Sequence, residues 1–66
     1  MNDIGNWYLI NTIINKNEDI PNFRLGEKYS FEMIKGLCVN CRISWFGKDE
    51  VEFSCENYSL IFKKDI

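Results

Sequence analysis

The chain has 66 residues, a size at which one domain folds around one small core, so we expect a single domain over residues 1–66. Ten acidic and eight basic residues give a net charge of −2 and are mixed along the chain, which disfavours a nucleic-acid-binding surface. The sequence has no histidine and therefore lacks the commonest general base and metal ligand, so we expect no enzyme activity, metal or other cofactor.

The apolar segments of the chain are short. None is long enough to cross a bilayer, and the N-terminal segment does not have the pattern of a secretion signal, so we expect a cytoplasmic protein. In a reducing compartment the three cysteines are expected to be free thiols that pack as small apolar side chains. A domain of this size can also gain stability from a partner chain, which leaves a homodimer or higher oligomer open.

The first predicted elements are a strand and a long loop. Residues 7–15, WYLINTIIN, are rich in aromatic and β-branched residues and predict a strand with apolar side chains on both faces. Residues 16–27, KNEDIPNFRLGE, contain the only proline together with Asn, Asp and Gly, which is typical of a connection without regular structure.

Residues 28–35, KYSFEMIK, admit two interpretations. Apolar side chains at Tyr29, Phe31 and Met33 alternate with polar ones, which favours a strand. Ser30 as an N-cap and a glycine at position 36 would instead bound one short helix. Because so few residues between those caps make a marginal helix, we favour the strand and keep a short helical turn as the alternative.

The clearest pattern is a hairpin. The odd positions of residues 37–45 are all apolar, and apolar and polar side chains also alternate in residues 50–56. A three-residue loop at 47–49 would pair Phe46 with Glu50. One dry face and one wet face fix the register, since a slip of one residue would expose the whole core side. This register pairs Trp45 with Val51, Ile43 with Phe53 and Cys41 with Cys55.

A last strand is predicted over residues 58–63, after a turn at Glu56 and Asn57. Its aromatic and aliphatic side chains at Tyr58, Leu60 and Phe62 again occupy every second position. The sequence therefore predicts an all-β fold: a small, antiparallel, five-stranded barrel.

Cys38 and Cys41 form a Cys-x-x-Cys pair that could suggest a metal or redox site. Within a strand these two side chains would point to opposite faces and could not hold one ion, so we expect no metal. Cys41 is expected in the core, facing Cys55, and Cys38 on the outer face or at an edge. A disulfide between Cys41 and Cys55 is geometrically conceivable, but a reducing compartment favours free thiols.

One set of residues is a candidate surface for binding a protein partner. The polar side of the predicted hairpin is acidic, which suits a partner with a basic surface, or serves only to keep the sheet soluble. A large apolar side chain interrupts this polar side and either packs under a loop or is an exposed contact. The residues of this predicted surface are Glu50, Glu52, Glu56 and Phe46.

A second set supports a different function. Phe23 and Arg24 in the long loop, with Arg42, combine an aromatic ring with the only two guanidinium groups, which recognise phosphate or carboxylate. In an oligomer they could line a pocket that sequesters a nucleotide-like signal. The alternative is that Arg24 is a solvated loop charge and Arg42 a cross-strand partner of a glutamate.

The order of these parts resembles a known family. One strand, a long loop, Gly26-Glu27-Lys28-Tyr29 entering a second strand, a one-sided hairpin and a short aromatic last strand look like the small SH3-like β-barrel proteins encoded by phages and mobile elements. Those proteins often have a Gly-Lys-x-Tyr entry, and here Glu27-Lys28 takes the two middle positions.

The resemblance implies an SH3-like barrel with a non-catalytic binding function. By analogy, such a protein would inhibit a host defence or nucleic-acid-processing protein in the host cytoplasm by occluding its surface. A nucleic-acid-binding SH3-like module is the remaining alternative, which the acidic balance disfavours.

Overall fold

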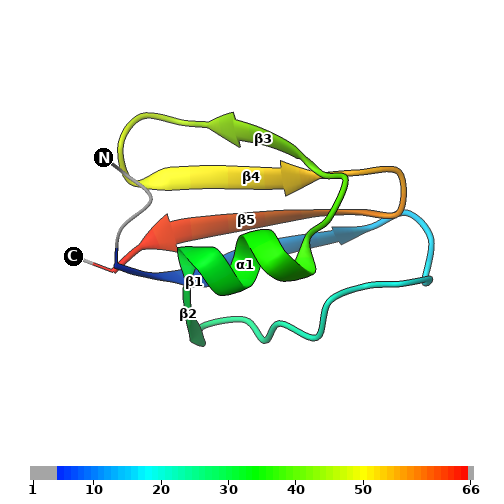
Figure 1. The fold of residues 1–66 in the computed structure, drawn as a ribbon, viewed down its shortest axis with the longest axis horizontal. Helices are drawn as coiled ribbons and strands as arrows, with labels where there is room; N and C mark the ends of the chain where they lie inside the picture. Colours follow the sequence, from blue (N-terminus) through cyan, green and yellow to red (C-terminus); the bar gives the residue numbers. More distant parts are fainter. Residues whose placement is uncertain (1–4, 66) are drawn as a thin grey trace.

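The computed structural model describes residues 5–65 of the chain (Figure 1). All four strand pairings in this part are antiparallel and join five strands into one sheet in the order β2-β1-β5-β4-β3. The predicted all-β, five-stranded antiparallel fold is confirmed. The elements are β1 (Asn6–Ile14), β2 (Lys28–Ser30), α1 (Phe31–Leu37), β3 (Arg42–Trp45), β4 (Glu50–Ser54) and β5 (Tyr58–Lys64).

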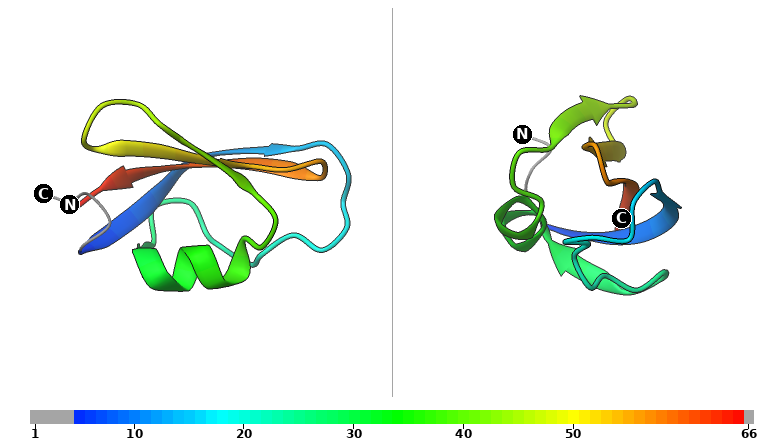
Figure 2. Two further views of the ribbon diagram at one scale, coloured as in Figure 1. Left: turned by 45° about the horizontal axis from the view of Figure 1, so that its top comes forward. Right: turned by 90° about the vertical axis from the view of Figure 1, so that its right-hand side faces the viewer.

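The sheet curls around a core and leaves one side open between its two edge strands, β2 and β3. Figure 2 shows α1 lying across this open side, which makes the molecule barrel-like when viewed end-on. The long connection between β1 and β2 runs without helix or named strand, as predicted, and an isolated β-bridge pairs its Leu25 with Leu9 of β1. Helix α1 and the β1–β2 loop therefore cover the part of the core that the five strands leave open.

Helix α1 begins where the alternation in residues 28–35 favoured a continued strand, so that prediction was wrong beyond Ser30. The Ser30 hydroxyl accepts a hydrogen bond from the Met33 backbone N–H at 3.2 Å and caps the helix. Gly36 lies inside the helix and does not follow its last turn. The C-cap is Cys38, whose backbone N–H donates to the Ile34 carbonyl at 2.8 Å.

The burial of α1 explains why the helix forms. Phe31, Ile34 and Cys38 follow the spacing of one helical face, and all three are buried against the open side of the sheet. In a strand, Phe31 and Met33 would have shared the dry face, but Met33 is half exposed here. The apolar spacing of three and four residues buries more surface at this position than the spacing of two, and tertiary packing decides the outcome.

The core is built mainly from aromatic and aliphatic side chains of every element except β2 and β3. Phe53 of β4 contacts both Phe31 of α1 and Phe62 of β5, with ring centroids 5.7 and 5.9 Å apart. The buried residues are Trp7, Leu9, Phe31, Ile34, Cys38, Val51, Phe53, Tyr58, Leu60 and Phe62.

The predicted hairpin register is confirmed where β3 exists. Trp45 pairs with Val51, Ile43 with Phe53, and the Phe46 N–H donates to the Glu50 carbonyl at 2.9 Å. Gly47 begins the connecting loop with a φ of 76°, a left-handed conformation that glycine adopts without steric cost.

The first half of that predicted strand is wrong. Residues 37–41 form the end of α1 and a turn, in which Asn40 has a φ of 61°. Leu37 and Val39, which were expected in the core, are 53% and 65% exposed. Their regular apolar spacing continues that of β3, although the backbone no longer has a strand conformation.

Candidate functional site

The outer face of the sheet groups three of the four residues predicted to bind a partner. Residues opposite one another in a β-ladder project to the same face, and Glu50 lies opposite both Phe46 on the β3 side and Lys63 on β5. Glu52 lies two residues further along β4, so its carboxylate is on the same face, between Ser44 and Ile61. Phe46, Glu50 and Glu52, called the outer surface below, are therefore neighbours.

Phe46 is an exposed side chain, with 52% of its surface accessible. The alternative that Phe46 packs under a loop is therefore wrong, and its role as a contact for a partner stays a prediction. Both carboxylates beside it are half-buried. The outer surface thus combines one large apolar side chain with two acidic groups.

Glu56 lies away from these residues. It follows the end of β4, in the turn that leads into β5, whereas Glu50 begins β4. Its carboxylate is 3.5 Å from the ammonium group of Lys16, and both side chains are exposed, so this ion pair contributes little to stability. The structure does not bring Glu56 together with the outer surface.

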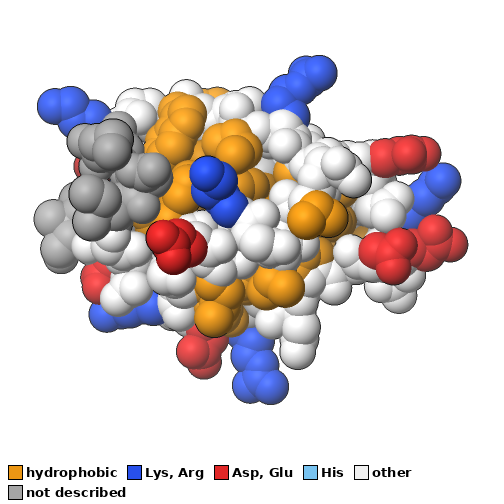
Figure 3. All heavy atoms as spheres, in the orientation of Figure 1, with side chains coloured by type: hydrophobic (Ala, Val, Ile, Leu, Met, Phe, Trp, Pro, Cys, Tyr) orange, Lys and Arg blue, Asp and Glu red, His pale blue; other side chains and the backbone are white. Residues whose placement is uncertain are grey.

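Strand β3 is an edge of the sheet. Ile43 and Trp45 were expected in the core, but they are 39% and 41% exposed, because β3 has a neighbour on one side only and α1 covers its inner face incompletely. Trp45 stacks on Phe31 with centroids 5.5 Å apart and an angle of 19° between the rings. Figure 3 shows hydrophobic side chains gathering over α1 and β3 around isolated charged ones.

The residues of the alternative ligand site are not brought together. Phe23 packs edge-on against Tyr29 and Phe62, with centroids 4.6 and 5.4 Å away, and so is partly buried against the core. Arg24 is exposed, and its backbone N–H donates to the Tyr29 hydroxyl at 2.8 Å. Arg42 lies on the outer face of β3, opposite Ser54. An inward-facing ring and an outward-facing guanidinium do not line a common pocket.

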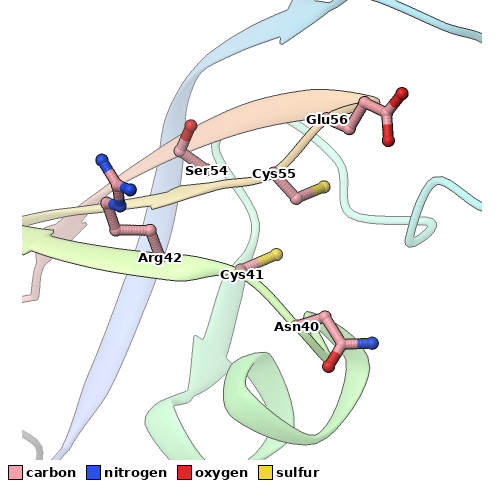
Figure 4. Close-up of a pocket in the computed structure, with 6 residues that line it drawn as sticks. All are labelled: Asn40, Cys41, Arg42, Ser54, Cys55 and Glu56. Carbon is pink, nitrogen blue, oxygen red and sulfur yellow. The ribbon is translucent and has the colours of Figure 1, made fainter.

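An open hollow lies at the end of the β3–β4 ladder, with a volume of about 630 Å³ (Figure 4). Cys41 and Cys55 are one residue beyond the paired Arg42 and Ser54, and their sulfur atoms point to the same side of the hairpin. The lining residues are Asn40, Cys41, Arg42, Ser54, Cys55 and Glu56, which we call the thiol pocket.

All three cysteines are free thiols, and they form one cluster with Tyr58. Cys38 is buried, which corrects its predicted place on the outer face or at an edge, because it ends a helix and does not sit in a strand. Cys41 and Cys55 are half-buried against the core. The Cys41 thiol donates to the Tyr58 hydroxyl at a distance of 3.3 Å.

The cluster divides the thiols by acidity. Burial raises the pKa of Cys38 to about 12 and also raises the pKa of Cys41 and of the Tyr58 hydroxyl. Burial acts in the same direction on Cys55, but hydrogen bonds from the backbone of Asn57 and Tyr58 outweigh it, so the pKa of Cys55 lies below its ordinary value. Cys55 is thus the thiol that ionises most readily.

Sequence reasoning placed Cys41 opposite Cys55 but missed Cys38 and Tyr58 as their neighbours. Tyr58 was predicted on the apolar side of the last strand, the same side as Cys41 and Cys55. That shared side was the signal from which a contact between its hydroxyl and the thiols could have been predicted. Cys38 could not be placed without knowing that α1 ends there.

The described part of the chain contains neither a ready metal site nor a membrane-spanning helix. Within residues 5–65, no group of three or more Cys, Asp or Glu side chains is arranged to hold a metal ion. In the same range, no helix is long and apolar enough to cross a membrane. Comparison with known proteins finds no family model, no curated protein and no solved structure that matches the chain.

Proposed function

We propose that the protein is a non-catalytic binding protein that occludes the surface of a partner protein through edge strand β3 and the outer surface. The observation that supports this most directly is that β3 ends the described sheet while carrying exposed apolar side chains on both of its faces. Ile43 and Trp45 project to the inner side and Phe46 to the outer side.

The backbone of β3 offers a docking edge. The Phe46 N–H bonds to Glu50, so by the antiparallel alternation residues 42 and 44 also bond to β4. The N–H and C=O groups of Ile43 and Trp45 then point away from β4, toward the free edge. An extended segment of a partner can pair with these groups and extend the sheet, a common mode of peptide recognition.

The acidic groups define the chemistry of such a segment. Glu50 and Glu52 lie on β4, one strand in from the edge, on the same face of the sheet as Phe46. A partner strand with apolar side chains facing Trp45 and basic side chains facing the two carboxylates matches both sides of β3. This extends the prediction of a basic partner from the sequence to a specific edge of the sheet.

The class of partner is proposed from the resemblance stated above. Small SH3-like proteins of phages and mobile elements suggest a host defence or nucleic-acid-processing protein as the target, bound in the host cytoplasm. Occlusion needs no catalytic group, and it depends only on the affinity and placement of the docked surface.

A proline at position 43 tests the edge directly. Ile43→Pro removes an N–H that points to the free edge and leaves the hydrogen bonds between β3 and β4 in place. We expect capture of a partner from host lysate by the immobilised protein to fall by about tenfold or more. Ile43→Thr, which keeps the N–H and the β-branched shape, is the matched control and should retain most of the capture.

Light scattering on the same variants identifies a different occupant of the edge. If the wild-type protein is a dimer and Ile43→Pro is a monomer, β3 binds a second copy of the chain. Equal capture by the wild type and Ile43→Pro, with both proteins folded by circular dichroism, would contradict the use of this edge.

Charge reversal tests the outer surface. Glu52→Lys should weaken capture because it places a positive charge where a basic partner docks, with an effect that shrinks as salt is added. Glu56→Lys makes the same charge change in the β4–β5 turn and should leave capture unchanged. Equal loss in both variants would show that only the net charge matters.

A further inference from the structure

We propose that Cys55 and Cys41 are a redox-active pair, in which Cys55 reacts with a small hydroperoxide and Cys41 converts the product into a cross-strand disulfide. This modification site lies in the thiol pocket and does not depend on the binding function proposed above. Three observations support it: the placement of the two residues at the end of the β3–β4 ladder, their access to the pocket, and the surroundings of each sulfur.

The placement of the two residues suits a disulfide. Cys41 and Cys55 lie one position beyond the pair Arg42 and Ser54. Because Phe46 and Glu50 are a hydrogen-bonded pair, the antiparallel alternation makes Arg42 and Ser54 another, and the next facing positions, those of the two cysteines, are not hydrogen-bonded to each other. Such facing residues have Cα atoms about 4.5 Å apart, within the range that a disulfide spans. Both sulfur atoms lie on the same side of the hairpin (Figure 4).

Access to the pair is open from the solvent. Both cysteines are half-buried and line the thiol pocket, whose volume of about 630 Å³ far exceeds that of a hydroperoxide molecule. Cys55 also lines an adjoining hollow of about 370 Å³ with Tyr58. Cys38 lines neither hollow and is 5% exposed, so it is not the first site of attack.

The surroundings assign the two roles. The backbone hydrogen bonds at Asn57 and Tyr58 stabilise the thiolate of Cys55, which is the nucleophilic form. Cys41 instead stays protonated at neutral pH and donates to Tyr58. The two residues flank the end of the same hairpin and their sulfur atoms point to the same side, so Cys41 is placed to attack the oxidised Cys55 (Figure 4).

The reaction has two steps. The Cys55 thiolate attacks one oxygen of hydrogen peroxide, an S–O bond forms, the O–O bond breaks, and the hydroxide released takes up a proton to become water. The Cys41 sulfur then attacks the Cys55 sulfenic acid, an S–S bond forms, the S–O bond breaks, and the departing hydroxide takes the Cys41 proton. Two thiols are oxidised by two electrons, and one peroxide is reduced to two waters.

The test is oxidation of the reduced full-length protein by hydrogen peroxide, followed by intact mass and counting of free thiols. We expect the wild type and Cys38→Ser to lose two thiols and the mass of two hydrogen atoms. Cys55→Ser should form no internal disulfide, and Cys41→Ser should stop at a sulfenic acid on Cys55 that dimedone traps.

Two outcomes would overturn the proposal. One is an internal disulfide in Cys55→Ser, which would assign the chemistry to Cys38 and Cys41. The other is an absence of disulfide in the wild type while all three thiols are oxidised singly.

Alkylation rates provide a second measurement that does not depend on any variant folding. In the native wild type at neutral pH, Cys55 should react with iodoacetamide about tenfold faster than Cys41 or Cys38. In denaturant the three rates should become equal. Equal rates in the native protein would contradict the assignment of Cys55 as the attacking thiol.

Discussion

Folding changes the acidity of four side chains, Cys38, Cys41, Cys55 and Tyr58. Cys38 is 5% exposed, and its pKa rises from 9.0 to about 12 because burial penalises the thiolate. A neutral thiol behaves there as a small apolar side chain at the end of α1. Its ionisation therefore affects the stability of the fold as well as its reactivity.

Stability should fall as the pH rises above 9. Below that pH, Cys38 is protonated in both the folded and the unfolded chain; between pH 9 and 12 only the unfolded chain loses the proton. The free energy of unfolding then decreases by at most about 1.4 kcal/mol per pH unit from this group. Urea unfolding of the wild type and Cys38→Ala as a function of pH measures the contribution, and equal slopes would contradict it.

At the residue scale, sequence patterns identified some burial correctly. Val51 and Phe53 were expected in the core and are fully buried, because β4 has a strand on each side. Trp45 was expected there too, but it is 41% exposed because β3 is an edge strand. The prediction failed because the alternation of apolar residues is the same in an edge strand and in an internal one. The order of strands in the sheet depends on the whole fold, and the alternation of apolar and polar residues within one strand does not predict it.

Among the elements, α1 depends on its cap more than a longer helix would. It has 7 residues, too few to be stable alone, and its first turn relies on the Ser30 hydroxyl and on burial of one face. The cap and the packing together outweigh the strand preference of the alternating side chains.

Removing the cap should lower stability measurably. We expect Ser30→Ala to cost about 1 kcal/mol in the free energy of unfolding, because the Met33 N–H loses its acceptor. Ser44→Ala, on edge strand β3, is the matched control and should change stability by less than about 0.5 kcal/mol. Equal losses in chemical unfolding experiments would show that the cap is not what begins the helix.

The hairpin of β3 and β4 was the most predictable pair of elements. The prediction failed only at the N-terminal end of its first strand. The glycine at position 47 and the alternation on both sides fixed the loop and the register from local sequence. Residues 37–41 continue the apolar alternation but belong to a helix end and a turn. No local signal separates them from a strand, since the helix that overrides the pattern starts upstream.

In the molecule as a whole, aromatic rings form a continuous chain of contacts. Successive ring contacts, with centroids 4.6 to 5.9 Å apart, join the β1–β2 loop, all five strands and α1. The rings belong to Tyr29, Phe23, Phe62, Phe53, Phe31, Trp45 and Trp7. Each element is therefore connected to the others through side chains as well as through the backbone.

Breaking this chain at its centre should unfold the domain. Phe53→Ala removes a fully buried ring that contacts Phe31 and Phe62, at a cost of about 3–5 kcal/mol. A core of this size supplies a net stability of about the same amount, so we expect no cooperative thermal transition. Phe46→Ala, outside the aromatic chain, should retain the transition, and a normal transition in Phe53→Ala would contradict the central role.

For the whole molecule, the fold class could be predicted from the sequence, whereas the outer surface and the thiol pocket could be predicted only in part. Alternating segments and turn residues indicated five antiparallel strands, and the outer surface followed from the hairpin register. The thiol pocket could be anticipated as Cys41 facing Cys55. The nearby buried thiol of Cys38, which lies outside the pocket, could not, because the end of α1 determines its position. The position of such a residue depends on contacts between elements that are far apart in the sequence, and local patterns do not predict these contacts.

The contact between the two tryptophans has an optical consequence. Trp7 is buried and Trp45 is exposed on β3, and their rings meet edge-to-face with centroids 5.7 Å apart. These are the only indoles in the chain, and their transitions couple at this separation. Near-ultraviolet dichroism and intrinsic fluorescence thus report on edge strand β3 without any added label, and a strand paired beside Trp45 would alter both signals.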